Sequence, residues 1–314
     1  MGFPNSPNLT RRIAKESFYG EMDAATNERV WPKFAERIPQ EVASVIRPGM
    51  GAMPKPTQLS GFAGGMSGAQ AKQLKDYSFT TTVVEWDLTV EMPRSSVEDL
   101  PDEVARIGRN HGNSASVFFD ERAIAQLDSA TALGYDGIAL YSGSHAESGT
   151  SQDNDRTTVA AGGTKPTAAE LEVALEEDLP VLRMFTDDQG RYVNEGVTRY
   201  TILIPPDYEY IYNLVLNPAL KDQAIDSSGI TGRFRGMFDI AVSGYCPATR
   251  HFIFAQNRTR KALGCFVKTD WDYNSNIGTA SDAWNHGRTA IFSGYARFEF
   301  QPWDWKTTIR HIYS

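Results

Sequence analysis

Hydrophobic and polar residues alternate most regularly over residues 79–90. The even positions from Thr80 to Val90 form a largely apolar face that includes Trp86, whereas the odd positions include Glu85. A period of two is typical of an antiparallel strand with one buried face. This segment is therefore predicted to be a half-buried strand.

A glycine-rich stretch lies upstream of this strand. Residues 42–46 form a short apolar run, and residues 48–68 are rich in Gly, Pro and Met. Residues 41–92 together predict a long two-stranded hairpin with a glycine-rich tip. A connection of this length without a core of its own is usually functional.

A helical pattern follows over residues 95–133. Acidic residues in its first turn stabilise the positive end of a helix dipole. At 1.5 Å per residue a continuous helix of about 36 residues here would be roughly 54 Å long. Gly108 and Gly112 are the positions where a bend is expected. The apolar residues recur at spacings of three and four: Val97, Leu100, Val104 and Ile107.

Shorter helices are predicted at three other places. One covers about Leu9–Phe18. A second begins at Thr167, where Glu170 three residues later completes a capping box, and is expected to stop at Pro180. A third runs from Asp207 to about Leu216.

The remaining apolar runs predict a chain whose last third is rich in strands. Because a hairpin, a long helix and then mixed strands and short helices follow one another, the predicted fold class is α+β. The predicted strands are residues 138–141, 200–204, 238–242, 252–255, 266–269 and 290–301.

Composition narrows the class of protein. The chain has 314 residues, of which 41% are hydrophobic and 22% charged, as in ordinary globular proteins. Its net charge of −8 argues against a dedicated nucleic-acid reader, which normally carries a basic stripe. We expect no membrane span and no signal peptide, because no run of 18 apolar residues and no apolar leader region occur.

Motifs for catalysis or metal binding are scarce. None of the five histidines forms an HExxH motif, and two cysteines are too few for a cysteine-rich zinc site. The sequence therefore predicts no catalytic residues, no cofactor and no metal. Ser144 next to His145 keeps a serine hydrolase open as an alternative, although no GxSxG elbow is present.

The order of these elements resembles that of the major capsid proteins of tailed bacteriophages, most closely the Mu-like major head subunits. The resemblance covers nearly the whole chain, from an N-terminal arm to a terminal aromatic strand. Besides the glycine-tipped hairpin, it rests on the helix opening Val97-Glu98-Asp99-Leu100, the string from Tyr135 to His145, the strand Ile202–Pro206 after Asp188–Arg191, and Trp303-Asp304-Trp305.

The resemblance implies the Hong Kong 97-type phage capsid fold, with an N-arm, an extended E-loop hairpin, a long spine helix, and peripheral and axial domains. The implied parts are an N-terminal arm at 1–40, the E-loop at 41–92, a peripheral domain with the spine helix at 93–180, an axial domain at 181–280, and C-terminal strands returning to the peripheral domain at 281–314.

The resemblance also implies a function. Such subunits self-assemble into hexamers and pentamers of an icosahedral shell that encloses double-stranded DNA without sequence-specific binding. The implied partners are other copies of the chain, portal and scaffold proteins and possible decoration proteins, with no membrane. The implied location is the virion, after assembly in the host cytoplasm. An encapsulin-like shell around a protein cargo is the alternative with the same fold.

The hairpin and the arm are expected to bury their apolar residues on neighbouring copies, because neither has a core of its own. The candidate intersubunit contacts are Gly61, Phe62, Gly64, Gly65, Gly68, Trp86, Leu88, Trp31 and Phe34.

Overall fold

The computed structural model describes residues 7–26, 28–50, 76–99, 101–147, 149–161, 163, 165–216, 234, 236–256, 260–277 and 281–314. The chain divides into two compact units. Unit 1 is drawn from residues 1–45, 82–126 and 264–300, and unit 2 from residues 46–81, 127–263 and 301–314.

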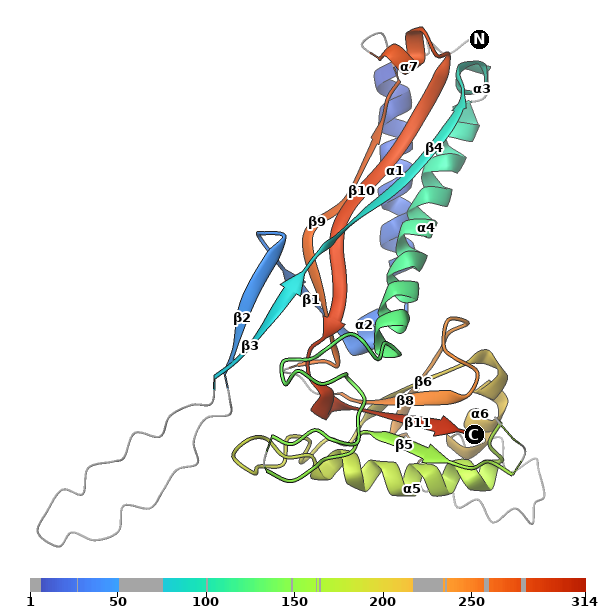
Figure 1. Ribbon diagram of the computed structural model, residues 1–314. Helices are drawn as coiled ribbons and strands as arrows, with labels where there is room; N and C mark the ends of the chain where they lie inside the picture. The colour runs from blue at the N-terminus through green and yellow to red at the C-terminus, as the bar shows by residue number, and fades with distance from the viewer. Residues whose placement is uncertain are drawn as a thin grey trace, which may run out of the picture. The chain divides into compact units, whose positions relative to one another are not determined.

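Unit 1 is built on a four-stranded sheet with the order β1-β9-β10-β4 (Figure 1). Strands β10 and β4 are antiparallel, with Thr289 opposite Pro93 at one end and Phe298 opposite Val84 at the other. The strands are β1 (Ala35–Pro39), β9 (Leu263–Ser275), β10 (Thr289–Pro302) and β4 (Val84–Pro93).

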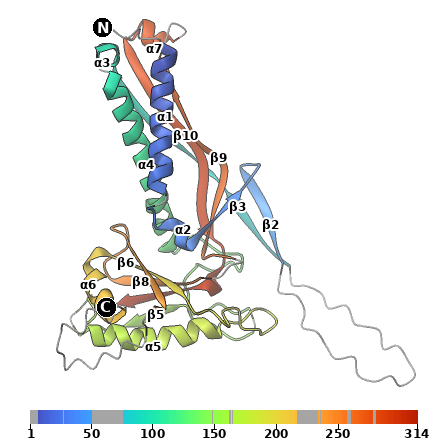
Figure 2. The same ribbon diagram turned by 180° about the vertical axis from the view of Figure 1, so that it is seen from behind.

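Two long helices, α1 (Pro7–Thr26) and α4 (Pro101–Leu127), run beside this sheet (Figures 1 and 2). Gly108 and Gly112 of α4 face α1: an added Cβ would lie 2.6 Å from the Ala14 carbonyl oxygen and 2.3 Å from that of Phe18. These glycines therefore allow close packing of the helices. Shorter helices of unit 1 are α2 (Trp31–Phe34), α3 (Arg94–Asp99) and α7 (Asp282–Asn285).

The N-terminal segment packs on its own unit, which corrects the expectation of an arm that buries itself elsewhere. Phe18 is fully buried, and its ring stacks on Tyr273 with 4.3 Å between ring centres. The Tyr19 hydroxyl donates to the Trp271 carbonyl oxygen over 3.0 Å. The predicted helix 9–18 is longer than expected because its apolar face has this partner.

Unit 2 contains a mixed five-stranded sheet with the order β5-β11-β8-β6-β7. Strand β11 is parallel to β5 and antiparallel to β8, and β6 is antiparallel to β8 and parallel to β7. The strands are β5 (Asp155–Thr158), β11 (Thr308–Tyr313), β8 (Arg250–Ala255), β6 (Tyr200–Ile204) and β7 (Phe238–Val242).

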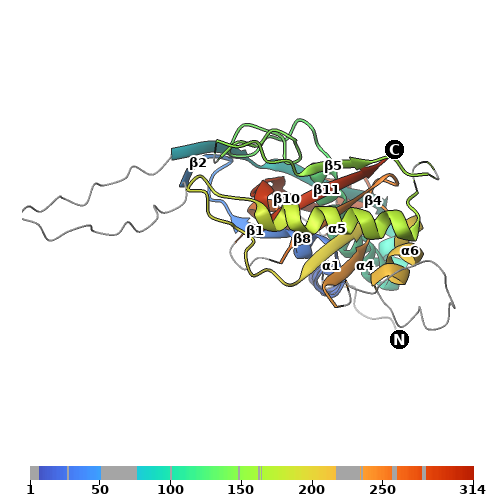
Figure 3. The same ribbon diagram turned by 90° about the horizontal axis from the view of Figure 1, so that it is seen from below.

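Helix α5 (Ala168–Met184) runs along this sheet (Figures 1 and 3). Thr167 and Glu170 form the predicted capping box. The helix does not stop at Pro180, because buried Leu182 in the following turn is held by packing against the core. The other helical segments of unit 2 are the 3₁₀ turns η1 (Pro206–Tyr208) and η3 (Trp305–Thr307) and helix α6 (Glu209–Leu216).

Several predicted boundaries differ from the structure. The long helix ends at Leu127, and residues 138–141 form no strand but only the isolated bridge between Leu133 and Ala139. The C-terminal strands are divided: β10 belongs to the sheet of unit 1 and β11 to that of unit 2. Helix α5 lies in unit 2 and most of β9 in unit 1.

The predicted hairpin is present as β2 (Ser44–Met50) paired with β3 (Asp76–Thr82). Its alternation changes phase where β3 gives way to β4. Thr81 and Val83 are buried at odd positions, whereas Trp86 and Leu88 are the less exposed residues at even positions. The phase changes because the chain leaves one sheet and enters another, and a step of one residue reverses the faces.

No helix within the described ranges is long and apolar enough to cross a bilayer.

Candidate functional site

Strand β4 lies at the edge of the unit 1 sheet, where it pairs with β10. No strand of the described residues pairs with its other edge. A free edge exposes backbone N–H and C=O groups that can pair with another chain. The residues along it alternate between half-buried positions such as Leu88 and exposed positions such as Glu85 and Asp87. These charges discourage indiscriminate pairing.

Trp86 is fixed in a half-buried position on β4. Its indole Nε1–H donates to the Phe298 carbonyl oxygen over 2.9 Å. Its ring packs edge-on against Phe118, with 4.8 Å between ring centres, and the Arg122 guanidinium lies 4.8 Å from the ring centre. The indole is therefore held in place on the sheet while part of it remains accessible.

A buried ion pair supports this arrangement. Nη2 of Arg122 donates to both carboxylate oxygens of Glu299, at 2.9 and 2.8 Å. Burial raises the pKa of Glu299, and the charge of Arg122 opposes that rise. Because Arg122 contacts both Glu299 and Trp86, the ion pair positions the indole.

Trp86 and Leu88 line an open hollow of about 430 Å³ in unit 1. Its apolar wall includes Phe118 and Trp271, and its polar members include Asn113. A hollow of this kind can receive a large apolar side chain. Sequence reasoning missed Phe118 and Trp271 as members of the site because they come from elements far from β4 along the chain. The full lining is Trp86, Asp87, Leu88, Asn113, Ser114, Ala115, Val117, Phe118, Glu121 and Trp271.

Trp31 and Phe34 do not lie on a contact surface, which corrects their assignment as intersubunit contacts. They are 7% and 1% exposed, and Trp31 packs against Phe119 and Phe300 with 5.6 and 5.7 Å between ring centres. Its backbone N–H donates to Asp120 Oδ1 over 2.9 Å. Aromatic residues in a proline-broken segment here are core residues whose partners come from α4 and β10.

Asp120 holds the start of helix α2 in place. Its Oδ1 accepts hydrogen bonds from the backbone N–H groups of Val30 and Trp31, at 3.1 and 2.9 Å. Burial raises the pKa of Asp120, and the hydrogen bond from Trp31 and the charge of Arg29 oppose the rise.

The glycine-rich tip lies outside the described residues. The candidate contacts that fall there are Gly61, Phe62, Gly64, Gly65 and Gly68.

The geometry around Ser144 and His145 does not form a nucleophile–base pair. His145 is fully buried, its Nδ1 lies 2.6 Å from Asp136 Oδ2, and its ring stacks on Trp305 with 4.2 Å between ring centres. The hydroxyl of Ser144 bonds to that of Ser142 over 2.9 Å. His145 is thus a core residue that fixes a loop.

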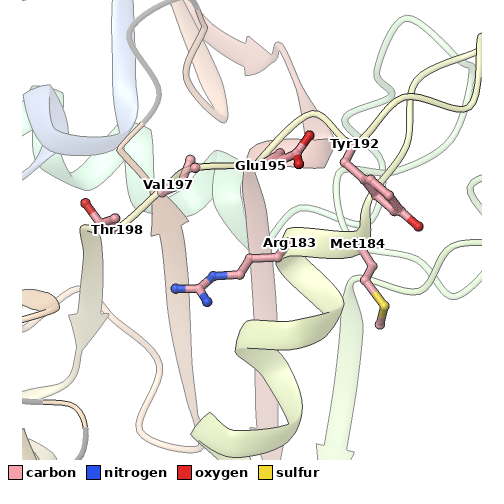
Figure 4. Close-up of a pocket in the computed structure, with 7 residues that line it drawn as sticks. Arg183, Met184, Tyr192, Glu195, Val197 and Thr198 are labelled. Carbon is pink, nitrogen blue, oxygen red and sulfur yellow. The ribbon is translucent and has the colours of Figure 1, made fainter.

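A second hollow, of about 290 Å³, lies in unit 2 after the end of α5 (Figure 4). Arg183 donates from Nε to the Tyr200 hydroxyl over 2.8 Å, while Met184 and Tyr192 are both 56% exposed. In Figure 4 the side chains of Arg183 and Met184 point in different directions from the helix end. The hollow offers an apolar rim rather than a convergent set of reactive groups.

Comparison with solved structures identifies the fold. The mature capsid of bacteriophage PhiM1 superposes with a TM-score of 0.59 at 12% identity, covering 91% of this chain and 87% of that chain. The capsid of cyanophage P-SCSP1u gives 0.60 at 12% identity, covering 91% and 88%. A virus-like particle from Pyrococcus furiosus gives 0.52 at 10% identity, covering 94% and 98%.

These similarities confirm the α+β Hong Kong 97-type capsid fold. None of the curated proteins matches this chain in sequence. A family model described as phage capsid protein matches residues 77–310, which is more than half of the chain. The chain therefore belongs to the phage capsid protein family and is a major capsid shell protein.

Proposed function

We propose that this capsid protein forms hexamers and pentamers that close into an icosahedral shell around double-stranded DNA. The observation that supports this best is β4, an edge strand with an open hollow beside it. A neighbouring copy could pair with the backbone N–H and C=O groups of this strand and place an apolar side chain in the hollow.

The occupant of this hollow is the part of the 41–92 hairpin of a neighbouring copy that precedes β4. Its tip carries Phe62, an apolar side chain of suitable size, among Gly61, Gly64, Gly65 and Gly68. Glycines permit backbone conformations that differ between hexamers and pentamers. Apolar burial contributes about 25 cal/mol per Å², and a closed shell repeats each contact many times.

The remaining partners follow from the same role. Portal, scaffold and decoration proteins bind the shell, and the shell assembles in the host cytoplasm before it becomes part of the virion. The chain works without catalysis, as a structural component. Its net charge of −8 suits a container that does not grip its contents.

Electron microscopy of the purified chain tests the assembly. We expect rings or closed shells, and a chain lacking residues 57–72 that folds but does not close a shell. A well-behaved monomer under all conditions would contradict the proposal. Particles purified from an infected host should contain double-stranded DNA; particles filled with a protein cargo would instead support an encapsulin-like compartment.

A further inference from the structure

Three side chains that commonly ligate metals meet in the core of unit 2. Asp178 comes from α5, His251 from β8 and His311 from β11, and each is at most 1% exposed. His251 and His311 lie directly opposite each other across the antiparallel pair. One ligand atom from each of the three residues lies within 4.8 Å of the other two.

The distances between these atoms suit a small cation. Asp178 Oδ2 is 2.8 Å from His311 Nδ1 and 3.8 Å from His251 Nε2. In a tetrahedral zinc site with bonds of about 2.0–2.1 Å, neighbouring ligand atoms are about 3.4 Å apart. The two distances from Asp178 Oδ2 fall on either side of that value, so small side-chain rotations would equalise them.

Two atoms of the cluster lack hydrogen bonds. Neither His251 Nε2 nor Asp178 Oδ1 has a hydrogen-bond partner among the described residues, and both are buried. Arg156 Nε lies 3.9 Å from Asp178 Oδ1, which is beyond hydrogen-bonding distance. Buried polar atoms without partners are costly and rare. A cation between the three side chains would satisfy both atoms.

The outer nitrogens of the two imidazoles are already held. His251 Nδ1 lies 2.6 Å from the Tyr212 hydroxyl, and His311 Nε2 lies 3.0 Å from Thr158 Oγ1. Metal-ligating histidines in proteins usually have such a partner on the nitrogen away from the metal, which fixes the ring and its tautomer. Both hydroxyl oxygens can accept that N–H.

We propose that Asp178, His251 and His311 bind one Zn²⁺ ion in a closed structural site. Two imidazoles and a carboxylate are ligands that zinc prefers, and the second oxygen of Asp178 can complete the coordination. The ion connects α5 to the paired strands β8 and β11. The sequence did not reveal the site because its ligands come from three distant elements rather than from one short motif.

The burial of the site determines how it is loaded. Since no ligand is accessible from solvent, the ion enters while unit 2 folds, and its binding free energy adds to folding stability. The native protein should therefore retain zinc during brief exposure to a chelator, and protein refolded in a chelator should lack it.

Metal analysis of the intact wild-type chain is the first experiment. Protein purified from zinc-containing medium should hold about one zinc per chain. Protein refolded in a chelator serves as the metal-free reference. Protein refolded with Zn²⁺ should have a Tm several degrees higher than this reference, whereas protein refolded with Mg²⁺ should have the same Tm. Refolding with Co²⁺ should give the visible absorption of a tetrahedral site. Wild-type protein that holds no zinc and shows neither response overturns the proposal.

Substitutions assign the ligands. His251→Gln and Asp178→Asn keep similar size and hydrogen-bonding capacity, and each should lose the Co²⁺ absorption. His286→Gln, at an exposed position, is the matched control and should keep it. Full Co²⁺ absorption in His251→Gln or Asp178→Asn overturns the assignment. If both variants fail to fold, the wild-type measurements alone decide.

Discussion

Arg122 and Glu299 show how one ion pair can position a side chain on an edge strand. The Glu299 carboxylate is almost fully buried, and Arg122 reaches it from α4 while its guanidinium also covers the Trp86 ring. Removing one member of a buried ion pair leaves an uncompensated charge, which costs more than the pair contributes when intact.

Arg122→Met should therefore lower the free energy of unfolding by roughly 3 kcal/mol at neutral pH. Urea unfolding followed by tryptophan fluorescence measures this loss. Arg12→Met is the control, because Arg12 pairs with Glu16 where both side chains are exposed, and such pairs contribute little. Equal losses in the two variants would show that burial of Glu299 has no part in the effect.

The raised pKa of Glu299 gives a second test. Burial raises this pKa above the ordinary value of 4.5, so the native state holds the proton more tightly than the unfolded chain. The contribution of Glu299 to stability is therefore fully present below pH 4.5 and decreases as pH rises through the raised native pKa.

Glu299→Gln, which cannot ionise, should lack this decrease. We expect the stability of wild type relative to Glu299→Gln to fall between pH 4.5 and the native pKa, as measured by urea unfolding at a series of pH values. A relative stability that rises over this interval would mean that Arg122 outweighs burial and that the native pKa is lowered.

At the scale of elements, the contact between α1 and α4 depends on glycine. A Cβ added to Gly112 of α4 would lie 2.3 Å from the Phe18 carbonyl oxygen, whereas a Cβ added to Gly20 of α1 would have no atom within 4 Å. The same substitution at the two glycines therefore separates packing from helix propensity.

Gly112→Ala should destabilise the protein by about 1–3 kcal/mol, because α1 must move away from α4. Gly20→Ala should stabilise it by about 0.5–1 kcal/mol, because alanine favours the helix and meets no obstacle. Thermal and urea unfolding of both variants measure the difference. A stabilising Gly112→Ala would mean that the two helices do not pack this closely.

The elements also show which features could be predicted from the sequence. Local signals were reliable: the alternation over β4 and the capping box of Thr167 and Glu170 are both present. Predictions that depended on distant partners were not. Pro180 lies inside α5, and Trp31 is buried against α4 and β10. The sequence around a proline or an aromatic residue does not indicate which distant residues pack on it, so neither the continuation of α5 nor the burial of Trp31 could be predicted.

The candidate sites show the same difference between local signals, which the sequence contains, and distant partners, which it does not. Trp86 and Leu88 could be selected because the period of β4 places them on one face. Apart from Asp87, the rest of their hollow comes from α4 and β9. The cluster of Asp178, His251 and His311 joins one helix and two strands. Single-sequence reasoning has no spacing rule for such a set, since only tertiary structure brings it together.

At the scale of the whole molecule, the proposed role of β4 and its hollow connects the fold of one subunit to assembly. Leu88 lines the hollow, whereas the neighbouring Thr89 is exposed and does not line it. A charge at either position leaves the backbone of the edge strand unchanged. Substituting each of these two residues therefore tests whether a neighbouring copy binds in the hollow or along the edge of β4.

Leu88→Glu should abolish closed shells, because a carboxylate in the hollow must be desolvated when an apolar side chain of a neighbour enters. Thr89→Glu should assemble as wild type does. Circular dichroism would establish that both subunits are folded, and electron microscopy with size-exclusion chromatography would measure assembly. If Leu88→Glu closes normal shells, the hollow is not an intersubunit contact. Loss of shells in both variants would instead indicate that added charge along β4 disrupts pairing of its free edge with a neighbouring copy.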